Sequence, residues 1–248
     1  MDKKVYFLSD AHLGSKFHVN PTDTERKLCR FLDFAKQDAH SIYLVGDIFD
    51  YWFEYKKVVP RGFTRVLGKL AEITDSGIDV HFFIGNHDIW LTDYLQNECG
   101  LIIHHAPIIA TINGKHLFIA HGDGLGDDSL SFKILRKIFH SKVLRFFFAG
   151  IHPRWTVALA HAWSSHSRES GAIADFLGED KEFLIKFAKE KVKKQPDIDY
   201  FIFGHRHIVL DFKLNDKTHV IHLGDWISHF SYAVLDEDGD VRLEKFDG

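Results

Sequence analysis

The sequence contains only two cysteines, Cys29 and Cys99, which lie far apart with no metal-binding or redox motif around them. This favours free buried thiols in a reducing cytoplasm over a disulfide framework. No run of about 18 apolar residues occurs, so no transmembrane helix is predicted. The apolar part of segment 1–10 is too short for the core of a signal peptide. We therefore expect a cytoplasmic protein.

An excess of positive charge is also missing. The 248 residues include 31 Lys and Arg against 35 Asp and Glu, a net charge of −4, so no nucleic-acid partner is expected from bulk charge. With 45% hydrophobic and 27% charged residues, the composition is typical of a globular protein with a substantial core. The length predicts one large domain or two small ones, and no internal repeat or low-complexity tract is present.

Short apolar runs rich in β-forming residues recur along the chain. They predict strands at 5–8, 42–45, 80–84, 116–120, 200–203, 219–223 and 232–236. Segments 24–37 and 62–77 separate the first three runs and carry apolar residues at helical spacing. This alternation indicates βαβ units, whereas the last fifty residues contain strands joined by tight turns. We predict an α/β sandwich with parallel strands early and antiparallel strands late.

One segment interrupts the series of strands. From Ser129 to Arg168 there is no acidic residue, but there are seven Lys or Arg and many Phe, Leu, Ile and Trp. The segment is predicted to be helical and to form an insertion that covers the sheet edge.

Metal-ligand residue types follow five of the predicted strands. In order, these residues are Asp10 and His12, Asp47, Asn86 to Asp88, His121 to Asp123, and His205 with His207. Ligands of open α/β sheets bind beyond the carboxyl ends of the strands. Three of the runs open with glycine, which lets the backbone turn tightly and leaves room beside it. Five such strand ends in series predict one convergent site.

The donor set narrows the chemistry of that site. Carboxylate, amide and imidazole donors without a thiolate argue against a structural zinc knot and favour Mn²⁺, Fe²⁺ or catalytic Zn²⁺. Seven donors are too many for one ion and suit two ions that share a carboxylate. Two ions about 3.5–4 Å apart clamp phosphate oxygens and lower the pKa of a bridging water. A phosphoester hydrolase is therefore predicted.

The same motifs resemble the calcineurin-like metallophosphoesterase superfamily. The resemblance rests on D-x-H (10–12), GD (46–47), GNHD (85–88), HGD (121–123) and GHRH (204–207), in the right order over most of the chain. It implies a four-layer αββα sandwich of two mixed sheets flanked by helices. It also implies a single domain, 1–248, with an inserted helical cap at approximately 127–178.

The resemblance further implies a role for each matching residue. One ion would be held by Asp10, His12, Asp47 and His207, and the other by Asp47, Asn86, His121 and His205. His87 would stabilise the charge of the phosphate or protonate the leaving oxygen, and Asp88 would orient His87. Asp123 either holds a ligand histidine or is a turn residue.

A finer resemblance is to the UDP-2,3-diacylglucosamine hydrolases of lipid A synthesis. Its cues are FLSDAHLG, VGDIFDYWF, GNHDIW, HGDGLGDDSLSFK and LGDWI. These enzymes hydrolyse a pyrophosphate and release UMP and 2,3-diacylglucosamine 1-phosphate, and their helical cap holds the acyl chains. By this resemblance Asp128, Ser165 and Arg168 are the candidate substrate contacts.

The acid-free insert suits such a substrate. Its apolar faces would line an acyl groove or touch a bilayer, and its basic residues would meet anionic headgroups or the diphosphate. The resemblance thus implies a peripheral location on the inner face of the cytoplasmic membrane. The alternative is a cationic helical hairpin packed on the core with its basic face in water.

The sequence departs from the best-known branch of these hydrolases, which has arginine where this chain has His87. Another nucleotide-diphospho-lipid, or a simple phosphodiester, therefore stays open as the substrate. A nuclease is disfavoured because no basic, aromatic groove is evident outside the insert. A non-catalytic scaffold is disfavoured because all seven predicted ligands are intact. The oligomeric state is not predicted.

Overall fold

The first of two sheets contains the amino-terminal strand in its interior. In the computed structural model, which describes residues 4–16, 18–126, 137–139, 141–157 and 175–248, this sheet has the order β11-β10-β1-β2-β3-β4. The parallel strands are β1 (Lys4–Leu8), β2 (Ala39–Val45), β3 (Asp79–Phe83) and β4 (Ile102–His104). The antiparallel strands are β10 (Ser231–Leu235) and β11 (Val241–Lys245).

The second sheet has five strands in the order β5-β6-β7-β9-β8. Three parallel strands form its centre, namely β6 (Lys115–Ala120), β7 (Tyr200–Phe203) and β9 (His219–Leu223). Antiparallel strands form its edges, namely β5 (Ile108–Ile112) and β8 (Val209–Lys213). Both sheets are therefore mixed, as predicted. We expected the late strands to be antiparallel. This is wrong for β7 and β9, which pair in parallel with each other and with β6 at the centre of the sheet.

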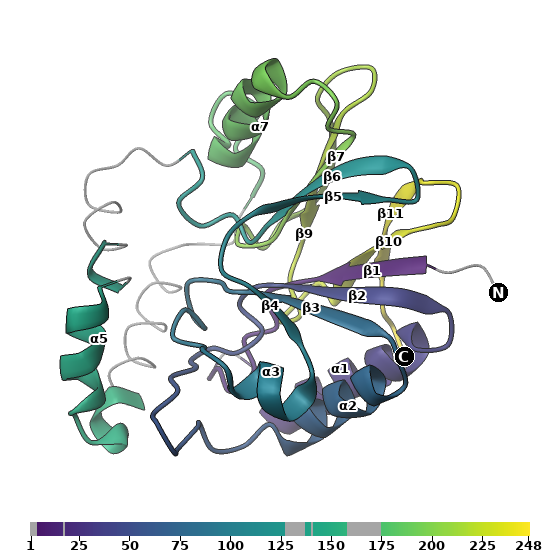
Figure 1. Ribbon diagram of the computed structural model, residues 1–248. Helices are drawn as coiled ribbons and strands as arrows, with labels where there is room; N and C mark the ends of the chain where they lie inside the picture. Colours follow the sequence, from purple (N-terminus) through teal and green to yellow (C-terminus); the bar gives the residue numbers. More distant parts are fainter. Residues whose placement is uncertain (1–3, 17, 127–136, 140, 158–174) are drawn as a thin grey trace.

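Helices cover the outer face of each sheet (Figure 1). The first sheet carries α1 (Pro21–Ala35), α2 (Thr64–Asp75) and α3 (Tyr94–Cys99), and the second carries α7 (Phe183–Lys194). Among the described residues, none of the helices has the length and apolar content needed to cross a bilayer.

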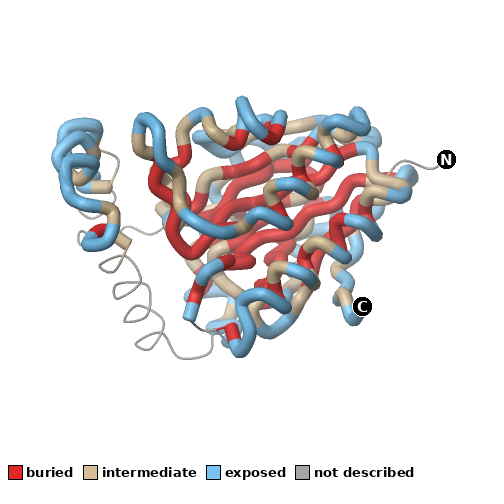
Figure 2. Tube along the Cα trace, turned by 90° about the horizontal axis from the view of Figure 1, so that it is seen from below, coloured by how far each residue is buried: buried red, intermediate tan, exposed pale blue. Residues whose placement is uncertain are grey.

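The sandwich has four layers, namely helices, two sheets and helices. Because side chains along each strand point alternately to the two faces of its sheet, three apolar clusters fill the spaces between the layers. On β2, Ile42 and Leu44 pack toward α1 and α2, whereas Tyr43 and Val45 pack between the two sheets. A third cluster, which includes Phe201, joins the second sheet to α7. Figure 2 shows the buried residues running along the strands. The predicted αββα sandwich is thus the observed architecture.

The element boundaries differ modestly from the predicted ones. Helix α1 begins at Pro21, earlier than predicted, because the Asn20 side chain accepts the backbone N–H of Thr22 and proline is favoured in the first turn. Helix α2 ends at Asp75, and Gly77 follows with a φ of 86°, as expected of a residue just beyond a helix.

Only part of the predicted insert lies within the described residues. Its helix α5 (Lys142–Ala149) begins after Ser141, whose side chain accepts the backbone N–H of Leu144. The helix stands beyond the loop ends of the strands (Figure 1). There Phe148 packs on Phe53 and Trp90, with ring centroids 5.3 and 4.7 Å apart. The expected position at a sheet edge is therefore wrong for this helix, because its aromatic partners lie on the loops after β2 and β3.

Candidate metal centre

Five loops deliver the predicted ligands to one place. They follow β1, β2, β3, β6 and β7, whose carboxyl ends all face the same side of the sandwich. The acid and imidazole donors form three overlapping groups, each with ligand atoms within 4.8 Å of one another. These groups are Asp10-His12-His207, His12-Asp47-His87 and Asp47-His121-His205. The overlap makes one continuous site.

Asp47 occupies the centre of this site. Its Oδ2 lies 3.3 Å from His121 Nε2 and 3.7 Å from His12 Nε2, so it faces a histidine of each predicted ion. Its Oδ1 accepts the backbone N–H of His87 at 2.8 Å. The residue is buried. This is the placement that a bridging carboxylate requires.

Asp10 links the first and last of the ligand loops. Its Oδ2 accepts the backbone N–H of His205 at 2.9 Å, and its Oδ1 lies 3.4 Å from His207 Nε2. Within the described part of the chain, Oδ1 has no hydrogen-bond donor although the residue is fully buried. An unsatisfied buried carboxylate oxygen calls for an explanation. A divalent cation fits it, and the oxygen and imidazole donors around it suit the same cation.

His121 shows how one of the imidazoles is oriented. Its Nδ1 lies 2.9 Å from the carbonyl oxygen of Val45, which can only accept, so the proton is on Nδ1. Its Nε2 lies 3.3 Å from Asn86 Oδ1 as well as near Asp47. The neighbouring His205 ring is 5.1 Å away. The four residues predicted for the second ion are therefore brought together.

The charges favour a cation. Burial alone would raise the pKa of Asp10, but the charge of His207 and the nearby His12 ring, with Nε2 3.7 Å from Asp10 Oδ1, outweigh it and lower that pKa to about 2. Burial lowers the pKa of His205 most, and the charge of His121 lowers it further, to about 4. An ionised carboxylate and a neutral imidazole are the forms that bind metal. Burial lowers the pKa of His121, but the charge of Asp47 outweighs it and raises that pKa, so this imidazole would release a proton on binding metal.

The glycines of the motifs are needed for close approach. A Cβ on Gly46 would overlap the His121 ring, and a Cβ on Gly85 would overlap the Asp47 carboxylate. This explains why both loops open with glycine.

The ligand backbone is strained. Five of the seven predicted ligands have φ between 42° and 67°, in the left-handed region, namely Asp10, His12, Asp47, His205 and His207. Non-glycine residues in this region are uncommon and cost on the order of 1 kcal/mol or more each, and they cluster at functional sites.

Asp88 contacts other groups than the His87 ring that it was predicted to orient. Both Asp88 oxygens accept backbone N–H groups, from Gly85 at 2.7 Å and Ile48 at 3.0 Å, so this buried carboxylate fixes the turn that carries His87. The acid beside the His87 ring is Asp50, whose carbonyl oxygen lies 2.9 Å and whose Oδ1 lies 3.6 Å from His87 Nδ1. The expectation that Asp88 orients the His87 ring is therefore corrected to Asp50.

Two acids of the site were missed by the sequence reasoning. Asp50 Oδ1 also lies 3.5 Å from His12 Nδ1, and Asp225 Oδ2 lies 3.4 Å from His207 Nδ1. Asp225 carries a signal that could have found it, because it follows β9 in a Gly-Asp pair, as Asp47 follows β2. Asp50 carries none, since it lies inside a loop.

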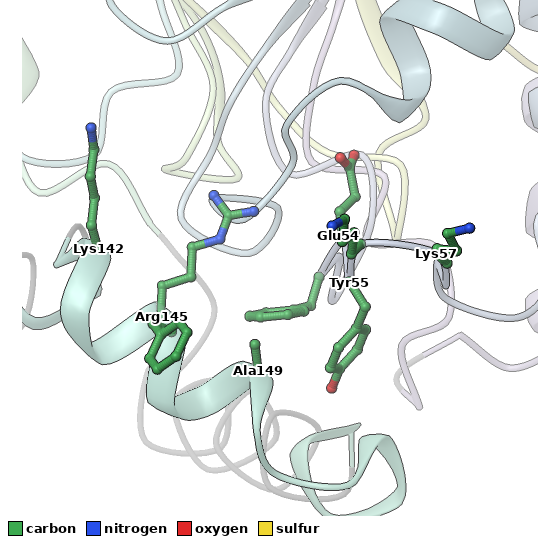
Figure 3. Close-up of a pocket in the computed structure, with 9 residues that line it drawn as sticks. Glu54, Tyr55, Lys57, Lys142, Arg145 and Ala149 are labelled. Atoms are coloured by element: carbon green, nitrogen blue, oxygen red, sulfur yellow. The ribbon is translucent and has the colours of Figure 1, made fainter.

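The predicted substrate contacts Asp128, Ser165 and Arg168 lie outside the described residues. Asp123 lines a small cavity of about 50 Å³ beside His121 and His104. A larger cavity of about 580 Å³ lies between α5 and the loop after β2 (Figure 3). Its lining is mainly apolar and basic, with one acid, Glu54: Phe53, Glu54, Tyr55, Lys56, Lys57, Lys142, Arg145, Phe146 and Ala149.

Comparison with known proteins agrees with the geometry. Over residues 3–209 the chain matches the calcineurin-like phosphoesterase family. It is 46% identical to a UDP-2,3-diacylglucosamine hydrolase of Porphyromonas gingivalis over 95% of both chains. It is 30% identical to one of Neisseria meningitidis over 98% of this chain and 100% of that protein. A solved phosphoesterase of E. coli covers 98% of this chain and 100% of its own, with 15% identity and a TM-score of 0.46.

The family match over most of the chain and the convergence of its motifs on one buried site lead to the same conclusion. The chain belongs to the calcineurin-like phosphoesterase family, and its buried site groups carboxylate and imidazole side chains that could hold metal ions.

Proposed function

We propose that this protein is a metal-dependent hydrolase that cleaves the pyrophosphate of UDP-2,3-diacylglucosamine to UMP and 2,3-diacylglucosamine 1-phosphate. The observation that carries the proposal is the shared position of Asp47 between two donor groups, in a chain 46% identical to a hydrolase of that name. Two donor groups around one carboxylate suit phosphoryl chemistry.

The residues present fit two divalent ions, and Mn²⁺ is the ion we expect, with Fe²⁺ or Zn²⁺ as alternatives. The first set is Asp10, His12, Asp47 and His207, and the second is Asp47, Asn86, His121 and His205. When bound, such ions supply an activated water and positive charge for the phosphate oxygens. The chain's own part is to bring these donors together and to orient them.

His87 is the residue we propose beside the reacting phosphate. Its Nδ1 is held by the carbonyl oxygen of Asp50, so the ring is fixed next to His12, with centroids 4.6 Å apart and planes nearly perpendicular. A fixed imidazole can stabilise the phosphate charge or give a proton to the leaving oxygen. Asp88 supports it by fixing the turn.

The helical cap, approximately residues 127–178, is proposed to bind the acylated part of the substrate. The cavity beside α5 has apolar walls, with Lys142 and Arg145 of α5 at one side and Lys57 of the loop after β2 at the other (Figure 3). On the same helix Phe146 and Phe147 are 75% and 67% exposed. Exposed aromatic residues next to basic ones suit a bilayer surface with anionic headgroups better than a hairpin packed on the core. We therefore propose a peripheral location on the inner face of the cytoplasmic membrane.

The test of the activity is metal-dependent release of UMP from UDP-2,3-diacylglucosamine by purified protein, with Asp47→Ala as the control. We expect rapid release with Mn²⁺ and none from the variant, because both ions lose a ligand. Absence of release while a simple phosphodiester is still hydrolysed would move the proposal to another substrate. Full turnover by a variant with a full metal complement would contradict the bridging role.

The test of the cap uses Phe146→Ser with Phe147→Ser. These changes remove exposed apolar surface without touching Phe148, which packs on Trp90 and Phe53. We expect weaker hydrolysis of acylated substrate and weaker binding to anionic vesicles, with turnover of a small chromogenic diester unchanged. Ile109→Ser on the edge strand β5 is the matched control, since it is also exposed but lies on an element other than the cap. Equal losses on both substrates would mean that α5 has only a structural role.

A further inference from the structure

The loop after β9 holds a carboxylate in a fixed position. Asp225 is 5% exposed, and its Oδ1 accepts three consecutive backbone N–H groups, from Ile227 at 3.0 Å, Ser228 at 2.7 Å and His229 at 3.0 Å. Three hydrogen bonds to one oxygen leave the side chain little freedom to rotate. The second oxygen is therefore aimed by the loop itself.

That second oxygen faces two imidazoles. Asp225 Oδ2 lies 3.4 Å from His207 Nδ1 and 3.2 Å from His229 Nδ1. On the other side of the His207 ring, Nε2 lies 3.4 Å from Asp10 Oδ1. The His207 ring thus spans the space between Asp225 and Asp10, with a different nitrogen toward each.

We propose that Asp225 is a positioning residue that fixes His207 in the tautomer with the proton on Nδ1, so that Nε2 presents its lone pair to the metal. A carboxylate without a proton can only accept, so it selects the N–H form of the nitrogen that it faces. Metal-binding histidines generally give their second N–H to a carboxylate or carbonyl, which orients the ring and strengthens the ligand. The inference rests on His207 as a ligand in the proposed function and is independent of the substrate.

The effect is specific for one of the two ions. His121, in the other set, is oriented by the carbonyl oxygen of Val45 instead. His12 has its own acid, Asp50. Loss of the Asp225 carboxylate should therefore weaken binding of the ion that His207 would hold and leave binding of the ion between Asp47 and His121 unchanged.

The variant Asp225→Asn tests this without disturbing the loop. The amide oxygen can keep the three backbone N–H groups, while the amide nitrogen, a donor, replaces the oxygen that faces His207. His207 Nδ1 then becomes the acceptor, and the proton moves to Nε2. Titration of metal-free protein with Mn²⁺, followed by the electron paramagnetic resonance of the free ion, should show one site weakened by about 10–100-fold and the other unchanged.

Controls separate this effect from a general disturbance. His229→Ala removes the other neighbour of Asp225 and should leave both sites unchanged. In a His207→Ala background, Asp225→Asn should add no further loss, because the residue through which it acts is gone. The ¹⁵N shifts of the His207 ring in metal-free protein report the tautomer directly and do not depend on activity. An unchanged tautomer, or equal weakening of both ions, would overturn the proposal.

Discussion

Trp90 is the main contact between the cap helix and the loop that carries His87. Its ring lies 4.7 Å from Phe148 and 5.5 Å from Phe139, and its Nε1–H donates to the carbonyl oxygen of Phe139 at 3.0 Å. Arg145 Nη2 donates in turn to the carbonyl oxygen of Trp90 at 3.2 Å. The change Trp90→Ala removes the ring and its N–H while leaving the backbone acceptor.

The expected cost follows from these contacts. Two aromatic pairs contribute about 0.5–1.5 kcal/mol each. One hydrogen bond contributes about 0.5–1.5 kcal/mol net. The docking of the cap should therefore weaken by about 1.5–4.5 kcal/mol, and at tenfold per 1.4 kcal/mol its open population should rise by about 10-fold to 1,600-fold. Because Trp90 is absent from the three buried core clusters, the two sheets should keep their stability.

Limited trypsin digestion measures the opening, since cleavage at Arg145 or Lys142 follows the open population when closing is fast. We expect faster cleavage of the cap with an unchanged melting temperature. Trp90→Phe keeps the ring contacts and loses only the N–H, so its cleavage should rise by about tenfold or less. A lower melting temperature without faster cap cleavage would refute the reasoning, because Trp90 would then stabilise the core.

Three further predictions concern other parts of the molecule. His87→Ala should reduce turnover by about 10²–10⁴-fold. If this loss of rate becomes smaller for substrates with better leaving groups, His87 donates a proton. If the loss is the same for all leaving groups, His87 stabilises the charge of the phosphate. Glu182, fully buried, accepts two Arg206 N–H groups at 3.0 Å, so Glu182→Gln should lower the free energy of unfolding in urea by about 3 kcal/mol, and an unchanged midpoint would contradict this. Burial lowers the pKa of His81 most, and the charge of His104 lowers it further, to about 4. Between pH 6.5 and 4 the unfolded chain therefore binds a proton that the folded chain does not, and up to about 3 kcal/mol of stability is lost as the pH falls through that window. His81→Phe should flatten this pH dependence in acid unfolding curves.

The buried strands and the ligands at their ends were predictable from the sequence. An apolar run such as 42–45 can only be a buried strand or helix, and the glycine and aspartate that follow it belong at a strand end. Since parallel strands bring their carboxyl ends to one side, the order of motifs was enough to place Asp10 beside His207 although 197 positions separate them along the chain.

Edge elements and supporting acids were harder to predict. Strands β5 and β8 alternate between partly buried and exposed residues, so their apolar signal is weak. Asp50 and Asp225 act through the rings they face, and which acid faces which ring is decided by how the loops fold together. The place of α5 was missed for the same reason, because its partners Phe53 and Trp90 are aromatic residues on loops.

The proposed metal donors come from both sheets, and this has a consequence for how the protein matures. The hydrogen bond from the His205 N–H to Asp10 Oδ2 joins β7 of one sheet to β1 of the other. A chain still being synthesised holds Asp10, His12 and Asp47 long before it holds His205 and His207. Neither proposed ion can therefore find its full set of donors until both sheets have assembled around each other. Metal capture would then mark the end of folding, and chains that stop short of residue 207 would be left without a working centre.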